Sequence, residues 1–364
     1  MATLTCGERL VRCLTGQPVD RIPFGVGLGW AGWGETHARW RSESGIADLD
    51  PAQFLRYDPG FAIPELQLGI FPEFPEITVS ETADFIVQRN KRGILLRQRR
   101  DHGSMPEFMD YPVKTRRDWD QLKAERLNPC QPGRIKENMA AFNDRIRQTG
   151  QAVQVGVFPY GVFGTVRDLM GVEAMLVAFY DEPEMVHDMM EHLTTVWLTV
   201  WEEAARQTRI DHIHIWEDMS GRQGSLISPA MAENFMMPCY DRIAAFAGAH
   251  HIPLVSVDTD GDCSELVPLM MRHGINAFLP FEVQAGNDIN EYRRLYPGLG
   301  IFFGLDKRAL AEGRPAIDRE VGKAAAMIQK GRYIPGFDHL IPPDVPWANF
   351  CYAAERIRNV CGAT

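Results

Sequence analysis

Five short apolar runs between residues 211 and 339 each end in acidic or imidazole side chains. The runs are IHIWED (213–218), PLVSVDTD (253–260), AFLPFE (277–282), GIFFGLD (300–306) and YIPGFDH (333–339). Continuous apolar runs are typical of parallel strands that are buried on both faces, and in a (β/α) barrel the carboxyl ends of the strands form the rim where chemistry occurs. The repeated pattern therefore predicts parallel strands with a functional site at their carboxyl ends.

Helical stretches separate these runs and predict the rest of the architecture. They lie at residues 4–16, 133–149, 171–208 with a break at 181–183, 229–249, 264–273, 288–296, 317–330 and 346–360. Strands that alternate with helices favour right-handed crossovers in a parallel sheet. Residues 23–29 and 153–158 bring the number of predicted strands to seven, and the eighth has no clear place in the sequence. We predict an α/β chain that forms a single (β/α)8 TIM barrel over residues 1–364.

The segment 30–125 does not follow this alternation, and we predict that it is an N-terminal elaboration of loops and short helices. Its first half is rich in Trp, Gly and Pro, which suggests a lid over one end of the barrel. Residues 76–101 have two β-leaning stretches around Asn90-Lys91-Arg92-Gly93 and predict an extra β-hairpin outside the barrel.

Charge and cysteine usage exclude several classes of function. The formal net charge is −10 and no basic stripe offsets it, which argues against nucleic acid or an anionic membrane surface as a partner. The seven cysteines include no Cys-x-x-Cys pair, and the N-terminus has no apolar signal region, so we expect reduced thiols in the cytoplasm. No window approaches the roughly 18 apolar residues of a membrane span.

The densest chemical segment is DTDGDCSE at residues 258–265. An EF-hand loop is rejected because its sixth and twelfth places hold Cys263 and Leu269 instead of glycine and glutamate. Asp262 and Glu265 are explained as residues that begin a helix. Asp258 and Asp260 alternate along a strand end and can face the same side, so metal binding, proton transfer, substrate hydroxyls and structural ion pairs all remain open for them.

In the run that precedes this segment, His212 and His214 share one face of the strand while Ile213, Ile215 and Glu217 share the other. A His-x-His pair can bind zinc, but its place at the start of a strand lies away from the barrel's rim. Glu217 ends the strand and is interpreted as functional.

Other residues at the predicted rim are also candidates for the functional site, and each has a functional and a structural interpretation. His339 can be an acid, a base or a metal ligand, or it can bond the backbone of its loop. Arg167, beside Asp168, fits an anion clamp as well as a surface ion pair. Trp30 and Trp33 can stack on a flat substrate or pack the N-terminal loops. We predict that the substrate-binding side chains are Trp30, Trp33, Arg167, Asp306 and Asp338.

Common motifs of nucleotide and nucleophilic enzymes are missing from the sequence. The run Gly25-Val26-Gly27-Leu28-Gly29-Trp30 departs from GxGxxG at its last place, and no Walker motif or Gly-x-Ser-x-Gly elbow is present. Metal-assisted and acid-base chemistry remain.

Several segments, in this order and spacing, resemble the uroporphyrinogen decarboxylase superfamily. They are ERL (8–10), GQPVDRIP (16–23), ISP (227–229), PCY (238–240), GLDKRALAEG (304–313), GRYIPGFDH (331–339) and IPPDVP (341–346). The resemblance spans nearly the whole chain, and it implies a (β/α)8 barrel.

The departures from this resemblance favour one branch of the superfamily. True uroporphyrinogen decarboxylases have an arginine-rich motif of the type RQAGRYLPEYR that holds the substrate's carboxylates, whereas this chain has GWAGWGE at residues 29–35. Charge therefore disfavours a porphyrinogen substrate. The stretch 76–101, followed by PEF (106–108) and PVKT (112–115), looks like the methyltransferase-like branch, whose members move methyl groups between small donors or thiols and corrinoid proteins.

In zinc-dependent members of that branch, a His-x-Cys pair at a strand end and a later cysteine bind the metal. By position these correspond to Asp258 and Asp260 and to residues 337–339, so no thiolate remains. The resemblance then implies a harder oxygen and nitrogen site for a divalent ion, with zinc expected first. Its predicted ligands are Glu217, Asp258, Asp260, Glu282 and His339.

The sequence thus predicts a cytoplasmic, methyltransferase-like enzyme in which Glu217, Asp258 and His339 are catalytic. We expect it to move a methyl group from a small methylated donor to a corrinoid on a separate protein or to tetrahydrofolate. A decarboxylase of a small organic acid and a non-catalytic ligand-binding barrel are the alternatives, and a homodimer is left open.

Overall fold

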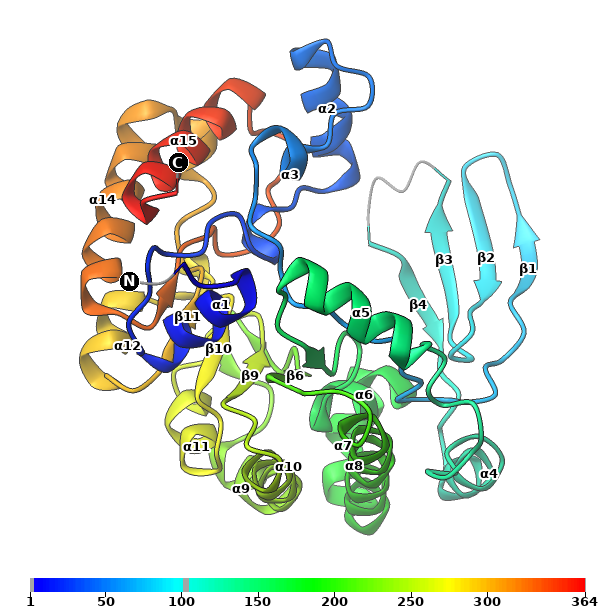
Figure 1. The fold of residues 1–364 in the computed structure, drawn as a ribbon. Helices are drawn as coiled ribbons and strands as arrows, with labels where there is room; N and C mark the ends of the chain where they lie inside the picture. The colour runs from blue at the N-terminus through cyan, green and yellow to red at the C-terminus, as the bar shows by residue number, and fades with distance from the viewer. Residues whose placement is uncertain (1–2, 101–104, 364) are drawn as a thin grey trace.

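A six-stranded parallel sheet forms the centre of the computed structural model, which describes residues 3–100 and 105–363 (Figure 1). Its strands, in spatial order, are β12 (Tyr333–Ile334), β11 (Gly300–Phe302), β10 (Ala277–Leu279), β9 (Leu254–Asp258), β6 (His212–Trp216) and β5 (Gln154–Val155). All neighbouring pairs are parallel. The five apolar runs of the sequence supply β6, β9, β10, β11 and β12, so the strands that they predict are confirmed.

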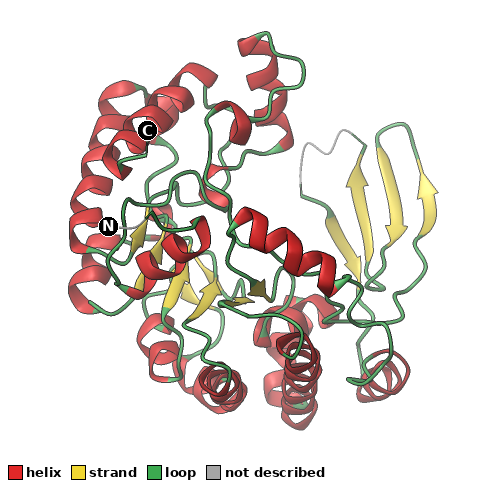
Figure 2. Ribbon diagram, in the orientation of Figure 1, coloured by secondary structure: helices red, strands yellow, loops and turns green. Residues whose placement is uncertain are grey.

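Helices separate the strands and form a layer outside the sheet (Figure 2). They are α5 (Met139–Thr149), α6 (Val162–Met170), α7 (Val172–Asp181), α8 (Pro183–Ala205), α9 (Pro229–Phe235), α10 (Met237–Ala249), α11 (Leu266–Arg272), α12 (Ile289–Leu295), α13 (Ala309–Glu312), α14 (Arg314–Lys330) and α15 (Trp347–Cys361). The predicted break at 181–183 is the junction of α7 and α8, where Pro183 occupies the first helical position. The structure therefore shows an α/β fold with a parallel sheet.

Isolated backbone bonds extend both edges of this sheet. Beside β12, the Phe337 amide donates to the Gly29 carbonyl at 3.1 Å, and beside β5, Ala62 forms a parallel bridge with Val153. The Asp58 amide donates to the Phe24 carbonyl at 2.8 Å, which joins the two added segments to each other. This arrangement is consistent with the predicted barrel, although the bonds at residues 24, 29 and 62 are isolated and these segments form no strand of their own.

The prediction of a strand over 23–29 is wrong, because no strand forms there and residues Leu28–Trp30 form the short 3-10 helix η1. Gly25 and Gly27 have φ angles of 74° and 81°, a left-handed conformation that interrupts extended backbone. A Cβ on Gly25 would lie 2.3 Å from the ring of Tyr57, so the close approach also requires glycine.

The N-terminal region contains more structure than the sequence predicted. Helix α1 (Cys6–Thr15) contacts β9, β11 and β12, helix α2 (Gly34–Ser44) contacts α15, and helix α4 (Arg116–Arg126) contacts α8, while α3 (Pro51–Phe54) is a short helix between α2 and β1. An antiparallel sheet stands apart from the main body in Figure 1. Its strands are β1 (Ile77–Glu81), β2 (Phe85–Arg89), β3 (Leu95–Arg99) and β4 (Glu107–Asp110), in that order. The predicted hairpin is therefore the β2–β3 part of a four-stranded sheet, and its last predicted residue, 101, lies outside the described residues.

One ion pair connects this small sheet to the main body. Arg92, in the β2–β3 turn, lies 3.1 Å from Asp168 of α6, measured from its Nε to the carboxylate oxygen. Burial raises the pKa of Asp168 to about 6, and the positive charges of Arg92 and Arg167 oppose that rise.

None of the helices in the described part of the chain has the length and apolar character of a membrane-spanning segment.

Candidate functional site

Polar side chains line the inner face of the two central strands, β6 and β9. His212 Nε2 lies 2.7 Å from Ser256 Oγ, and His214 Nδ1 lies 3.1 Å from the same oxygen. Because side chains alternate along a strand, Asp258 follows Ser256 on this face. Its carboxylate lies 3.8 Å from His214 Nε2. Burial lowers the pKa of His214 to about 4, so this imidazole is uncharged at neutral pH.

Asp258 is the last residue of β9, on the same face as Ser256. Burial raises its pKa well above the ordinary value, and the negative charges of Asp260 and Asp218 add to the rise while His339 opposes it. A carboxyl group of this kind keeps its proton to a higher pH than an exposed one, and in its protonated form it can donate a hydrogen bond.

Asp260 and His339 form the next contact of the rim. Their closest atoms, Oδ2 and Nε2, are 3.5 Å apart. Burial lowers the pKa of His339, but its hydrogen bond to Asp260 and the charge of that carboxylate raise the pKa more, so the net shift is upward. The imidazole also stacks against the half-exposed Trp33, with ring centroids 6.3 Å apart. Asp258, Asp260, His339 and Trp33 are thus brought together by the fold.

A lysine that the sequence analysis did not select lies among the acids of the rim. Lys307 Nζ is 3.5 Å from Glu282 Oε1 and 3.6 Å from Asp338 Oδ1. The side chain of Asp338 is fully buried, and burial raises its pKa while Lys307 lowers it. The sequence contains one signal for this lysine, because Lys307 directly follows Asp306 at the end of an apolar run. It was not selected because only acids and histidines were considered at the strand ends.

Glu217 points away from this cluster. Its Oε1 accepts hydrogen bonds from the Tyr240 hydroxyl at 2.6 Å and the Val162 amide at 2.9 Å. Its Oε2 accepts from the amides of Phe163 and Gly164 at 2.7 and 2.9 Å. The carboxylate therefore holds the first turn of α6. Burial raises the pKa of Glu217 to about 7, while these four donors lower it.

Two glycines make this capping arrangement fit. A Cβ on Gly161 would lie 1.8 Å from the Trp216 carbonyl oxygen, and a Cβ on Gly164 would lie 2.3 Å from it. The helix can therefore begin directly against the end of β6. Glu217 is thus occupied by the start of α6 and does not join the other predicted metal ligands.

The predicted substrate-binding residues divide between the rim and other places. Trp30 is 2% exposed and donates from its indole N–H to the Pro335 carbonyl, so it belongs to the core. Asp306 forms an ion pair at 2.7 Å with Arg308, the residue directly before α13. Arg167 pairs with Asp218 at 2.5 Å and lies over the Trp216 ring, 5.5 Å from its centroid, so it borders the rim.

Strained backbone occurs at both ends of the parallel strands. Asp218, Phe281 and Phe303 follow β6, β10 and β11 with φ angles of 42°, 60° and 73°, while His251 and Arg332 precede β9 and β12 with φ angles of 53° and 55°. Non-glycine residues in this left-handed region cost about 1 to 3 kcal/mol each. Because the strain is present at both edges of the sheet, it does not by itself locate the site.

The predicted metal ligands do not fit a divalent ion as their side chains stand. Across residues 3–100 and 105–363, no three His, Cys, Asp or Glu side chains are arranged to hold one. Glu217 is occupied by α6, and Lys307 places a cation beside Glu282. Zinc binding stays a prediction, and no step of the chemistry below depends on it.

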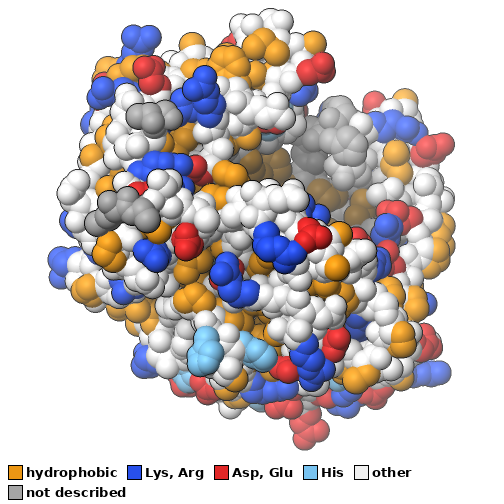
Figure 3. Space-filling view, in the orientation of Figure 1, with side chains coloured by type: hydrophobic (Ala, Val, Ile, Leu, Met, Phe, Trp, Pro, Cys, Tyr) orange, Lys and Arg blue, Asp and Glu red, His pale blue; other side chains and the backbone are white. Residues whose placement is uncertain are grey.

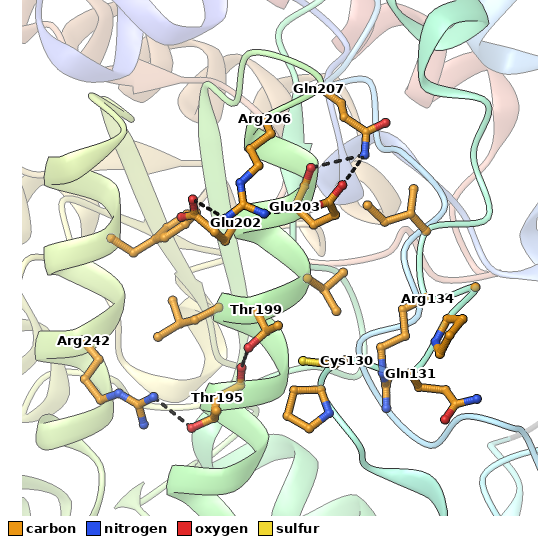
Figure 4. Close-up of a pocket in the computed structure, with 17 residues that line it drawn as sticks. Cys130, Gln131, Arg134, Thr195, Thr199, Glu202, Glu203, Arg206, Gln207 and Arg242 are labelled. Atoms are coloured by element: carbon orange, nitrogen blue, oxygen red, sulfur yellow. Dashed lines mark hydrogen bonds and ion pairs between the residues drawn. The ribbon is translucent and has the colours of Figure 1, made fainter.

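The surface of the protein has two hollows. The face seen in Figure 3 is hollowed between the main body and the antiparallel sheet, with hydrophobic side chains in its depth. A separate groove of about 700 Å³ lies between α8, α10 and the segment before α5 (Figure 4). Its lining on α8 runs from Thr195 to Glu203 and continues after the helix with Arg206 and Gln207, on the side that leads to the amino end of β6. This groove is therefore at the opposite end of the strands from the titratable cluster.

Comparisons with known proteins place the chain in a family. The model of the uroporphyrinogen decarboxylase (URO-D) family matches residues 82–360, which is most of the chain. A solved structure, a methyltransferase from Methanosarcina mazei, has a TM-score of 0.60 and 14% sequence identity, with 98% of this chain and 99% of that chain covered. At this identity the likeness shows the fold. No curated protein matches the sequence.

Proposed function

This chain belongs to the uroporphyrinogen decarboxylase family, and on that premise we propose that it is a methyltransferase-like enzyme. It moves a methyl group from a small methylated donor to an acceptor, which is a corrinoid on a separate protein or a folate. The fold that it shares with a methyltransferase supports this proposal. The absence of the arginine-rich motif between residues 29 and 35 also supports it, because a polycarboxylate substrate would meet a site rich in acids.

The site is placed at the mouth of a (β/α)8 barrel. In this proposal the six parallel strands are completed by the segments around Gly29 and Ala62, whose bonds to Phe337 and Val153 lie at the two edges of the sheet. Side chains that follow the strands then meet at one rim.

The observation that carries the proposal is the pair formed by His339 and Asp260, together with the stacked Trp33. A carboxylate beside an imidazole favours the protonated ring, which is the form that a general acid needs. The adjacent indole offers a flat surface to an aromatic or otherwise planar donor.

Methyl transfer from a methoxy-type donor needs such an acid. When the acceptor attacks the methyl carbon, the bond between carbon and oxygen breaks and its electron pair stays on the oxygen. His339 gives its proton to that oxygen, and the products are an alcohol and the methylated acceptor. Asp258, whose pKa is raised by burial, donates a second hydrogen bond to the leaving oxygen in its protonated form. General acids of this kind contribute roughly 10²- to 10⁴-fold to a rate.

A demethylation assay tests the proposal. Purified protein is incubated with methoxylated aromatics and methylated amines, together with a reduced corrinoid protein or tetrahydrofolate, and the demethylated product is measured by mass spectrometry. Product that depends on both donor and acceptor is the expected result. The matched control is His339→Asn, which keeps a polar side chain of similar reach but removes the titratable group.

Other outcomes identify the alternatives. Release of carbon dioxide from small organic acids, without methyl transfer, would make the chain a decarboxylase. Binding of these compounds without any product would make it a ligand-binding barrel. Either result overturns the methyltransferase proposal.

A further inference from the structure

Lys307 is a cation set between two carboxylates at the rim. Its side chain is 15% exposed, while those of Glu282 and Asp338 are 25% and 0% exposed. The ammonium group lies 3.5 Å from the first carboxylate and 3.6 Å from the second. The lysine therefore sets one positive charge against two carboxylates that have little contact with solvent, where a charge pair is screened less than at the surface.

Backbone donors complete the surroundings of these two acids. Asp338 accepts from the Val283 amide at 2.8 Å and from the amide of Lys307 itself at 3.1 Å. Glu282 accepts from the Gly261 amide at 3.0 Å. The segments that follow β9, β10, β11 and β12 are therefore held together by one network, and the Lys307 ammonium is the charge at its centre.

We infer that Lys307 is a positioning residue that takes the place of a divalent cation at this rim. An ammonium group and a metal ion compete for the same carboxylate oxygens, and hard divalent ions depend on several such oxygens. Here Glu282 already shares its charge with the lysine. The site is thus built to order its acids without a metal, which explains why the ligands expected from the sequence do not converge.

The inference predicts how the two carboxylates respond when the Lys307 ammonium group is removed. Removing the ammonium leaves Glu282 and Asp338 without their cation. A divalent ion then meets two carboxylates with no ammonium group to compete for their oxygens, and water can supply its remaining ligands. The inference rests on the proposed function only for the location of the site, because binding is measured without turnover.

Equilibrium dialysis tests the inference by measuring how much Co²⁺ is bound by the wild-type protein and by the variants Lys307→Met and Lys307→Arg. Methionine keeps the length of the side chain without its charge, and arginine keeps the charge. The expected result is no bound Co²⁺ at the rim of the wild type and of Lys307→Arg, and one ion per chain in Lys307→Met. The double variant Lys307→Met with Glu282→Gln should lose that ion again. If circular dichroism shows that Lys307→Met is unfolded, Lys307→Gln replaces it.

Turnover supplies a second measurement that a merely structural lysine would not affect. Lys307→Ala should lose about 10²-fold in kcat, since small misplacements of an active-site group have effects of this size. Added ethylammonium should restore part of the rate without changing the melting temperature.

Two results would overturn the inference. Wild-type protein that binds Co²⁺ and loses it in Asp260→Asn or His339→Asn would make the metal native to the rim. Folded Lys307→Met or Lys307→Gln that binds no Co²⁺ would mean that the lysine does not stand where a cation fits. The proposed methyl transfer can fail or succeed in either case.

Discussion

Two acids at the ends of neighbouring strands have opposite surroundings. Glu217 follows β6 and Asp258 ends β9, and the Glu217 amide donates to the Asp258 carbonyl at 2.8 Å, so their backbones are in contact. The Glu217 side chain turns toward the helix layer and has four hydrogen-bond donors on its two oxygens. The Asp258 side chain turns inward to His214, and its carboxylate has neither a capping amide nor a lysine. Position after a strand is therefore not sufficient for a functional role.

The difference lies in unused hydrogen-bonding capacity. A carboxylate whose lone pairs are all taken by the protein stabilises the fold, and one with lone pairs or a proton to spare can act on a substrate. The same contrast separates Trp30, whose indole N–H bonds the Pro335 carbonyl, from Trp33, which is 39% exposed beside His339.

The strongest way to break this comparison is to remove the inward-facing acid group. Asp258→Ala and His339→Ala should each lower turnover by about 10²- to 10⁴-fold, because each removes a proton donor to the leaving group. Thermal unfolding should change little, since neither side chain caps a helix. Wild-type rates in both folded variants would remove these residues from the mechanism.

The outward-facing acid should show the reverse pattern. Glu217→Ala should reduce the free energy of unfolding by about 3 to 5 kcal/mol, because buried donors that lose their acceptor are costly and α6 loses its capping group. Chemical denaturation measures this loss. Glu217→Gln, which keeps one acceptor oxygen, serves as the control and should lose less. If Glu217→Ala keeps wild-type stability and loses only turnover, the assignment of a structural role is wrong.

The pH dependence of turnover sharpens the role of the Asp260–His339 pair. Because the folded-state pKa of His339 is raised above its ordinary 6.5, the acid is present below that raised pKa and turnover should fall as pH rises through it. The pair's contribution to stability has the same sign, since it is complete below the unfolded pKa and lost on passing the folded one.

Asp260→Asn should move the fall in turnover to lower pH, because the substitution removes the charge that raises the pKa of His339. Rate profiles of the wild type and the variant measure the shift. A profile that stays in place would show that another group controls the alkaline limb.

The smallest expected effect concerns the exposed indole. Trp33→Ala should raise KM about 2- to 10-fold with little change in kcat, because aromatic contacts contribute roughly 0.5 to 1.5 kcal/mol. Trp30→Ala, three positions earlier in the chain, should instead lower thermal stability. Steady-state kinetics and melting curves together distinguish the two, and identical behaviour of the variants would contradict the division.

Much of the fold was readable from the sequence, because the signals that specify it are local. Continuous apolar runs gave β6, β9, β10, β11 and β12, and proline after an acidic pair gave the junction of α7 and α8. The edges of the sheet were less readable. Residues around Gly29 and Ala62 join it through isolated backbone bonds, and such bonds leave no periodic pattern in the side chains.

The sequence by itself determined which chemical groups stand at the strand ends, and its alternation already grouped Glu217 with Ile213 and Ile215 rather than with the histidines. Only the tertiary structure decided what each group contacts. The first turn of α6 occupies Glu217, Arg308 occupies Asp306, and Lys307 lies between Glu282 and Asp338. The contacts of Glu217 and Lys307 join residues from separate strand-end segments and helices, and the free energy of a charged group depends on the donors and charges that surround it after folding.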